Sequence, residues 1–216
     1  MTTPSTATYA LLGLLAVQSW TGYELTQQAR RSLRYAWPTS EAHLYREQQR
    51  LVHLGWATLD HELVGKRHRN RYTITPQGRH AFSQWLTTEP AHPRIEVEAI
   101  LRIFFADHGS VDDLRATLHD TAQQARASID EMLDYAQEFL TTGGRFPERL
   151  HLIGLAAELV TDLLAQIETL CQEAAAEVEP WTSTKNLGLT DTTRARLERL
   201  LTKYRQPDSD HQEAVD

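Results

Sequence analysis

Several features common in secreted and membrane proteins are missing from the sequence. It contains one cysteine, Cys171, in 216 residues, and one cysteine cannot form a disulfide within the chain. Its longest apolar run, residues 9–17, is much shorter than the roughly 20 residues that cross a bilayer. The first thirty residues lack the basic start and apolar stretch of a signal peptide. We therefore expect a soluble, cytoplasmic protein.

The sequence motifs of common enzyme sites are missing as well. There is no GxxxxGK[ST] phosphate loop, no GxGxxG after a strand and no GxSxG nucleophile turn. Ten histidines are present, but none has a ligand spacing with the cysteine, and the His61-Glu62 pair lacks the second histidine of HExxH. We expect no catalytic site, no metal site and no cofactor.

The net charge is −7, but the balance of positive and negative side chains differs between the two halves of the chain. Residues 1–90 hold ten Lys/Arg and six Asp/Glu, a net of +4, whereas residues 91–216 hold twelve and twenty-three, a net of −11. The densest group lies in VGKRHRNRYTIT. Such asymmetry suggests nucleic-acid contact by the basic half, while the acidic half is explained by well-solvated helices.

Two short helices are expected at the start of the chain. Residues 6–17 form an apolar helix that ends at a break over residues 19–22. Thr21 can cap a second helix over residues 22–33. The residues of the second helix expected to face inward are Tyr23, Leu25 and Ala29.

A third helix is expected after Pro38. Thr39 or Ser40 can cap its start, and Gly55 suits the left-handed position after its end. A helical wheel gives it an inward face and a basic outward face with no carboxylate at its centre. The inward face comprises Leu44, Tyr45, Gln48, Leu51 and Val52, and the outward face comprises Ala42, His43, Arg46, Arg50 and His53.

After Gly55, the spacing of apolar residues changes from that of a helix to the alternation of a strand. Residues 57–64 alternate as a strand, residues 65–70 form a turn, and residues 71–75 form a second strand rich in β-branched and aromatic side chains. The product is a β-hairpin with a cationic tip. Thr75 and the following proline can start a fourth helix, and TTEPAHPR is a linker.

This order of elements is typical of a winged helix-turn-helix domain, in which the third helix enters the DNA major groove and the hairpin is the wing. Arginine suits both places, because its planar fork can bind guanine or clamp a phosphate. The candidate residues of the recognition helix are Thr39, Ser40, His43, Arg46 and Arg50. Those of the wing are Lys66, Arg67, His68, Arg69, Asn70 and Arg71.

The second half is helical in pattern, which makes the whole chain mainly α with a small β-hairpin. Apolar residues step by three and four through residues 111–140 and again through residues 148–179, as in antiparallel helices that pack along a heptad seam. The apolar faces are wider than one hairpin can cover, so we expect a homodimer. The residues expected at its interface are Leu118, Ile129, Met132, Val160, Leu163, Ile167 and Leu170.

Residues 9–86 resemble the PadR family of bacterial transcriptional regulators. The resemblance is carried by YALLGLLAVQSWTGYEL, HLYREQQRLVHLGW and RHRNRYTITPQGRHAFSQWL. The second half, with EAILRIFFADHG, resembles the longer helical dimerisation domain of one branch of that family. The resemblance implies a homodimeric winged-helix repressor that binds double-stranded DNA at a pseudopalindromic operator. In this family, a small-molecule effector often relieves the binding to DNA.

The sequence departs from the family pattern in two places. Gln48 stands where the third helix usually has leucine, and the residues after Trp181 have no recognised counterpart. There we expect another amphipathic helix, starting at Thr190 or Asp191, and then a disordered acidic tail.

These features divide the chain into three parts. The expected DNA-binding domain spans residues 1–89, the helical dimerisation domain spans residues 90–205, and the disordered tail spans residues 206–216. The leading hypothesis is a DNA-binding regulator. The alternative is a winged-helix module that has lost DNA binding and recruits protein through its acidic half.

Overall fold

The computed structural model describes residues 4–64, 67–185 and 187–205. The backbone alone is described at residues 62–64 and 67–69. The chain divides into two compact units, Met1–Arg94 and Ile95–Asp216. The tail expected to be disordered lies outside the described residues.

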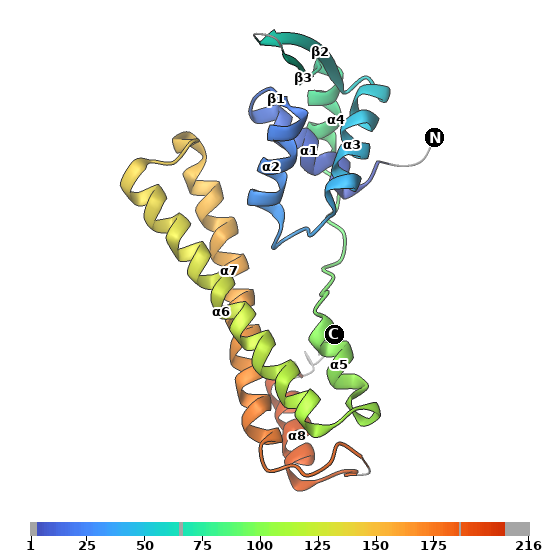
Figure 1. Cartoon of the computed structure of the whole chain (residues 1–216), viewed down its shortest axis with the longest axis vertical. Coiled ribbons are helices and arrows are strands. Elements are labelled where there is room, and N and C mark those ends of the chain that lie inside the picture. The colour runs from blue at the N-terminus through green and yellow to red at the C-terminus, as the bar shows by residue number, and fades with distance from the viewer. Residues whose placement is uncertain (1–3, 65–66, 186, 206–216) are drawn as a thin grey trace, which may run out of the picture. The chain divides into compact units, whose positions relative to one another are not determined.

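The first unit is a winged helix-turn-helix domain, as predicted. Three helices pack together, and a hairpin of two long strands projects from them (Figure 1). Its elements are α1 (Thr6–Val17), β1 (Trp20–Thr21), α2 (Gly22–Leu33), α3 (Glu41–His53), β2 (Ala57–Val64), β3 (Arg67–Ile74) and α4 (Pro76–Leu86).

Local hydrogen bonds set the starts of these helices. The side chains of Thr21, Ser40 and Thr75 each accept a hydrogen bond from the backbone N–H three residues on, and Thr21 forms a reciprocal capping box with Glu24. Such bonds satisfy donors that the first helical turn leaves unpaired. Gly55, with a φ of 70°, follows α3 in the left-handed conformation. The predicted caps of α2 and α4 are therefore confirmed, and α3 uses Ser40.

The sheet differs from the prediction in two respects. Trp20 and Thr21, expected to be only a break, form a third strand opposite Tyr72 and Arg71 of β3. The expected six-residue turn is also wrong, because β3 begins at Arg67, which is paired with Val64.

Cross-strand pairing explains why the strand extends through this polar segment. Next to the segment, the register places Asp60 opposite Arg71, the first residue of the predicted strand, and opposite charges across an antiparallel ladder contribute about 0.2–1 kcal/mol. Asn70 lies opposite His61, and the His61 Nδ1 and Asn70 Oδ1 atoms are 2.8 Å apart. These contacts require the partner strand, so the composition of the segment alone predicts a turn.

The core of the first unit combines leucines with a small polar layer. Leu11, Leu12 and Leu15 of α1 are fully or almost fully buried, as are Leu25 and Leu51. The buried polar side chains between α1, α2 and α3 are those of Thr8, Thr26, Glu47 and Gln48. Tyr23, predicted to face inward, is 67% exposed, because α2 turns only its opposite face toward this core.

Gln48 packs tightly despite replacing an expected leucine. Its side chain is fully buried, and Nε2 donates to the Gly22 carbonyl at 3.0 Å and to Thr26 Oγ1 at 2.8 Å. The buried N–H donors need such partners, because leaving a buried polar group without hydrogen bonds costs about 1–3 kcal/mol, whereas Gln48 Oε1 has no hydrogen-bond partner among the described residues. A Cβ atom on Gly22 would lie only 3.0 Å from Gln48 Oε1, so the glycine permits this close approach of α2 and α3.

The second unit is helical. Its long helices lie side by side as an antiparallel hairpin joined by a turn in which Gly143 and Gly144 have positive φ (Figure 1). Its elements are α5 (Glu98–Phe104), η1 (Ala106–His108), α6 (Val111–Thr142), η2 (Pro147–Arg149), α7 (Leu150–Val178) and α8 (Asp191–Tyr204). The predicted pair of long helices is confirmed.

One end of the hairpin has a core of its own. Leu114, Leu118 and Ala122 of α6 pack with Cys171 and Val178 of α7. Arg115 closes this end, since Nη2 donates to the Trp181 carbonyl at 2.8 Å and Nη1 pairs with Asp112. Burial raises the pKa of the Cys171 thiol. We infer that Cys171 is a packing residue, because burial disfavours the reactive thiolate.

Two glycines provide a matched test of the packing. A Cβ on Gly78 would lie 2.1 Å from the Trp56 carbonyl oxygen, whereas a Cβ on Gly154 of α7 would meet nothing within 4 Å. Gly78→Ala should therefore destabilise the first unit by about 3 kcal/mol, the upper part of the usual range for overpacking. Gly154→Ala should stabilise α7 by about 0.5–1 kcal/mol, the ordinary gain in a helix.

Urea unfolding measures both effects. Tryptophan fluorescence reports mainly on the first unit, which holds four of the five tryptophans, and circular dichroism follows the helices. An unchanged fluorescence midpoint for Gly78→Ala would contradict the described contact between α4 and Trp56.

Candidate nucleic-acid interface

The outward face of α3 is the candidate surface for reading bases. Ser40 starts the helix by accepting from the His43 N–H, and Thr39 lies half-buried just before it. Arg46, in the second turn, is exposed as predicted. Its Nη2 atom lies 3.5 Å from His43 Nδ1, which keeps the two side chains together.

Two exposed residues on this surface were missed by the sequence prediction. Tyr45, assigned to the inward face, is 41% exposed, and Gln49 is also exposed. Gln49 Nε2 donates to the Tyr72 hydroxyl at 2.9 Å. Burial, and then the neighbouring Tyr45, raise the pKa of Tyr72, so its hydroxyl stays protonated. The four-residue spacing of Tyr45 and Gln49 was the signal that could have found them.

A carboxylate lies buried beside this surface, although the centre of the outward face carries none. Glu47 is buried, and its Oε1 atom is 3.6 Å from Arg50 Nη1 and 4.0 Å from His43 Nε2. Its Oε2 accepts a short hydrogen bond from the Thr8 hydroxyl of α1. The wheel assigned Glu47 to neither face, and its contact with Thr8 of α1 was not visible from the sequence of α3 alone.

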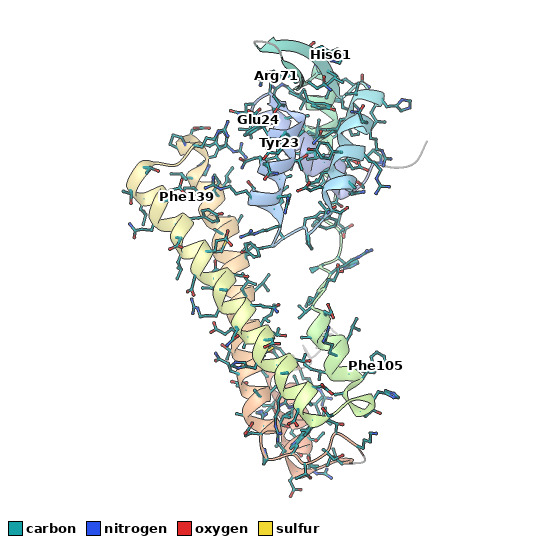
Figure 2. All side chains as sticks on the ribbon, viewed as in Figure 1. Tyr23, Glu24, His61, Arg71, Phe105 and Phe139 are labelled. Carbon is teal, nitrogen blue, oxygen red and sulfur yellow. The ribbon has the colours of Figure 1, made fainter. Side chains whose placement is uncertain are left out.

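The wing residues differ in what the structure describes. Lys66 lies outside the described residues, and the side chains of Arg67, His68 and Arg69 are not described. Arg71, labelled with His61 in Figure 2, is half-buried and donates from Nη1 to the Ser19 carbonyl at 3.4 Å. Arg71 therefore joins the hairpin to the segment before β1, and Asn70 contacts His61, so both support the wing structurally.

The residues predicted for dimerisation separate into inner and outer groups. Leu118 is 1% exposed and Ile129 5%, so both are buried within one chain, and Ile167 packs against the core beside Cys171. Met132 and Val160 are half-buried. Leu163 and Leu170 are exposed and continue a row on α7 that we call the α7 stripe. The α7 stripe consists of Leu152, Leu155, Leu159, Leu163 and Leu170.

No metal centre competes with this interpretation. Within residues 4–64, 67–185 and 187–205, no group of three or more His, Cys, Asp or Glu side chains could hold a metal ion. The described chemistry is that of a polar surface with exposed arginine, tyrosine and amide groups. The arrangement as a whole is that of a winged-helix nucleic-acid-binding protein.

Part of the chain is similar in sequence to known transcriptional regulators. Residues 11–84 match the model of the Transcriptional regulator PadR-like family. The Negative transcriptional regulator PadR of Bacillus subtilis is 25% identical over 126 residues, which are 57% of this chain and 69% of the relative. Residues 11–84, which hold most of the winged helix-turn-helix domain, are therefore similar to the PadR-like family of DNA-binding transcriptional regulators. Members of such regulator families are normally not enzymes.

Solved structures share the fold over most of the chain. Bacillus subtilis PadR in complex with operator DNA has a TM-score of 0.66 at 18% identity, covering 81% of this chain and 99% of that chain. The same protein with p-coumaric acid has a TM-score of 0.60 at 19% identity, with coverages of 81% and 99%. The Vibrio cholerae virulence activator AphA has a TM-score of 0.62 at 21% identity, with coverages of 81% and 98%.

Arg46→Ala tests the candidate surface. The variant should lose about 1–3 kcal/mol of binding free energy on a duplex that the wild-type protein selects from a random library, because an arginine at this position of a recognition helix is expected to contact a base edge. On random-sequence duplex the loss should be much smaller. Fluorescence anisotropy of labelled duplexes measures both, with Arg102→Ala on α5 as the control for removal of an exposed arginine. Equal losses on both duplexes would make Arg46 a phosphate contact.

Proposed function

We propose that the chain is an intracellular homodimeric repressor that binds a pseudopalindromic operator and is released by a small-molecule effector. The observation that carries the proposal is that the chain has two exposed features. One is the arginine-bearing outward face of α3, and the other is the apolar α7 stripe, which is exposed in a single chain. The first supplies one reading helix per chain, and the second supplies a means of pairing two chains.

The operator geometry follows from two-fold symmetry. A dimer of helix-turn-helix domains places two recognition helices on one side of the duplex, at half-sites separated by about 34–36 Å or a multiple. Arg46 in the second turn of α3 would face base edges, and the wing cations would face phosphates. The residues proposed for base contact are His43, Tyr45, Arg46 and Gln49. Those proposed for phosphate contact are Lys66, Arg67, His68 and Arg69.

A second copy of the chain is the proposed occupant of the α7 stripe. The segment Pro147–Val178 is long and apolar enough to cross a membrane by length and composition, which the sequence prediction missed because polar residues interrupt the apolar runs. However, Glu158 and Asp162 are exposed on the same helix. A carboxylate at the centre of a bilayer costs about 3 kcal/mol. A partly hydrated interface between two protein chains is therefore more favourable for α7 than a position across a membrane.

The direction of regulation and the effector are proposed from relatives. The Bacillus subtilis relative is named a negative regulator, and its structure with p-coumaric acid supports a small organic effector for this chain. AphA is named an activator, so the direction needs a direct test. A reporter promoter that carries the selected duplex should be less active when the protein is produced, and increased activity would contradict repression.

The wing is tested by its dependence on salt. Arg67→Ala with Arg69→Ala should weaken binding to selected and random duplexes about equally, because phosphate contacts carry no sequence information. Each lost phosphate contact reduces the steepness of log affinity against log salt by about 0.9. For a dimer that loses two contacts per chain, this slope should therefore become less steep by roughly 3–4. Anisotropy titrations at several salt concentrations measure the slope. An unchanged slope in a folded double variant would refute the proposed role of the wing.

The α7 stripe is tested by the state of association. Leu159→Glu with Leu163→Glu should weaken the dimer at least about 100-fold, because each buried leucine contributes about 1.5–3 kcal/mol. Ile167 is unsuitable for this test, since it packs inside the chain. Sedimentation velocity measures the effect, with Leu140→Glu as the control because Leu140 is 85% exposed on α6 and outside the α7 stripe. A wild-type protein that is monomeric at micromolar concentration would contradict the dimer.

A further inference from the structure

Glu47 combines a buried carboxylate with neighbours on the DNA-facing side of α3. Only 7% of its side chain is exposed, although it belongs to the proposed recognition helix. A carboxylate removed from water is costly unless charged or hydrogen-bonding groups compensate it. The described groups around it are the Thr8 hydroxyl on the inner side and the His43 and Arg50 side chains on the outer side.

The inner partner is fixed by the start of α1. Thr8 is fully buried, and its Oγ1 atom accepts from the Ser5 N–H at 2.9 Å. The same oxygen then donates its proton to Glu47 Oε2. The capping box of α1 therefore positions the Thr8 hydroxyl, and the hydroxyl anchors one oxygen of the carboxylate.

The outer partner is an arginine that could otherwise reach DNA. Arg50 lies four residues after Arg46, which places both on one side of α3. The side chain of Arg50 is 24% exposed and directs Nη1 toward Glu47 Oε1 at 3.6 Å, whereas Arg46 is exposed. The two arginines of this helix face therefore differ in exposure, and the less exposed one, Arg50, is the one that lies beside Glu47.

We propose that Glu47 is a positioning residue that holds Arg50 back from the phosphate backbone, so that base-reading residues rather than an unspecific cation dominate the contact of α3. The carboxylate offsets the charge of Arg50 and turns the guanidinium toward the protein. A recognition helix gains discrimination this way, because phosphate contacts add affinity to every sequence equally. This inference rests on the proposed binding of DNA by α3.

Glu47→Gln is the primary test, since the amide can still accept from Thr8 but carries no charge to hold Arg50. The slope of log affinity against log salt on random-sequence duplex should steepen by about 0.9 per released arginine, or roughly 2 for a dimer. Affinity for that duplex at low salt should rise several-fold. A residue with only a structural role would leave the slope of the folded protein unchanged.

Arg50→Ala identifies the arginine responsible. In the wild-type background it should leave the slope unchanged, and in the Glu47→Gln background it should remove the added slope. Glu98→Gln is the matched control, because it removes the same charge and frees Arg102 from an ion pair in the second unit. It should not alter the slope.

The outcomes separate this inference from the proposed function. A folded Glu47→Gln protein with the wild-type slope would overturn the role of Glu47, and so would a flatter slope for Arg50→Ala alone, which would mean that Arg50 already contacts phosphate. If circular dichroism shows that Glu47→Gln does not fold, the salt slope of Arg50→Ala alone decides the role of Glu47. An unchanged slope supports the proposed role, and a flatter slope overturns it. A wild-type protein that binds neither selected nor random duplex would instead refute DNA binding itself.

Discussion

The attachment of α3 to the rest of its domain depends on the buried hydrogen bonds of Gln48. Its amide donates to the Gly22 carbonyl and to Thr26, so a shift of α3 along α2 would leave a polar group buried without partners. One residue earlier, Glu47 is bound by Thr8 of α1. The recognition helix is therefore fixed by directional bonds to two other helices. Apolar contacts alone would fix its orientation less strictly, and that orientation decides which side chains reach DNA.

Elements whose signals are local could be predicted from the sequence. Thr21, Thr75 and Pro76 mark helix starts through bonds within a few residues, and Gly55 marks the end of α3 for the same reason. The elements that were missed depend on distant partners. Trp20 and Thr21 become a strand only because β3 lies beside them, and the polar start of β3 pairs only because β2 is present. Propensity contains no information about such pairing.

The candidate site was predicted in part for a similar reason. Arg46 is exposed as the helical wheel required, but Tyr45 is exposed although it was assigned to the inward face, and Glu47, which was assigned to neither face, is buried, because neighbouring helices cover α3 unevenly. In the second half, the apolar period found α6 and α7 but could not assign their residues. Leu118 and Leu163 belong to the same kind of repeat, yet one is buried within the chain and the other is exposed. The helical spacing of apolar residues identifies an apolar face of a helix, but it does not identify the element or chain that covers that face.

Contact between the outward face of α3 and DNA can be measured by hydroxyl-radical footprinting of the protein with and without the selected duplex. Tyr45 is the best reporter, because it is aromatic and 41% exposed on that face, while Tyr204 in α8 serves as an internal reference at 66% exposure. Bound DNA should protect Tyr45 from oxidation and leave the oxidation of Tyr204 unchanged. Oxidation of Tyr45 at the same rate in free and bound protein would contradict this contact.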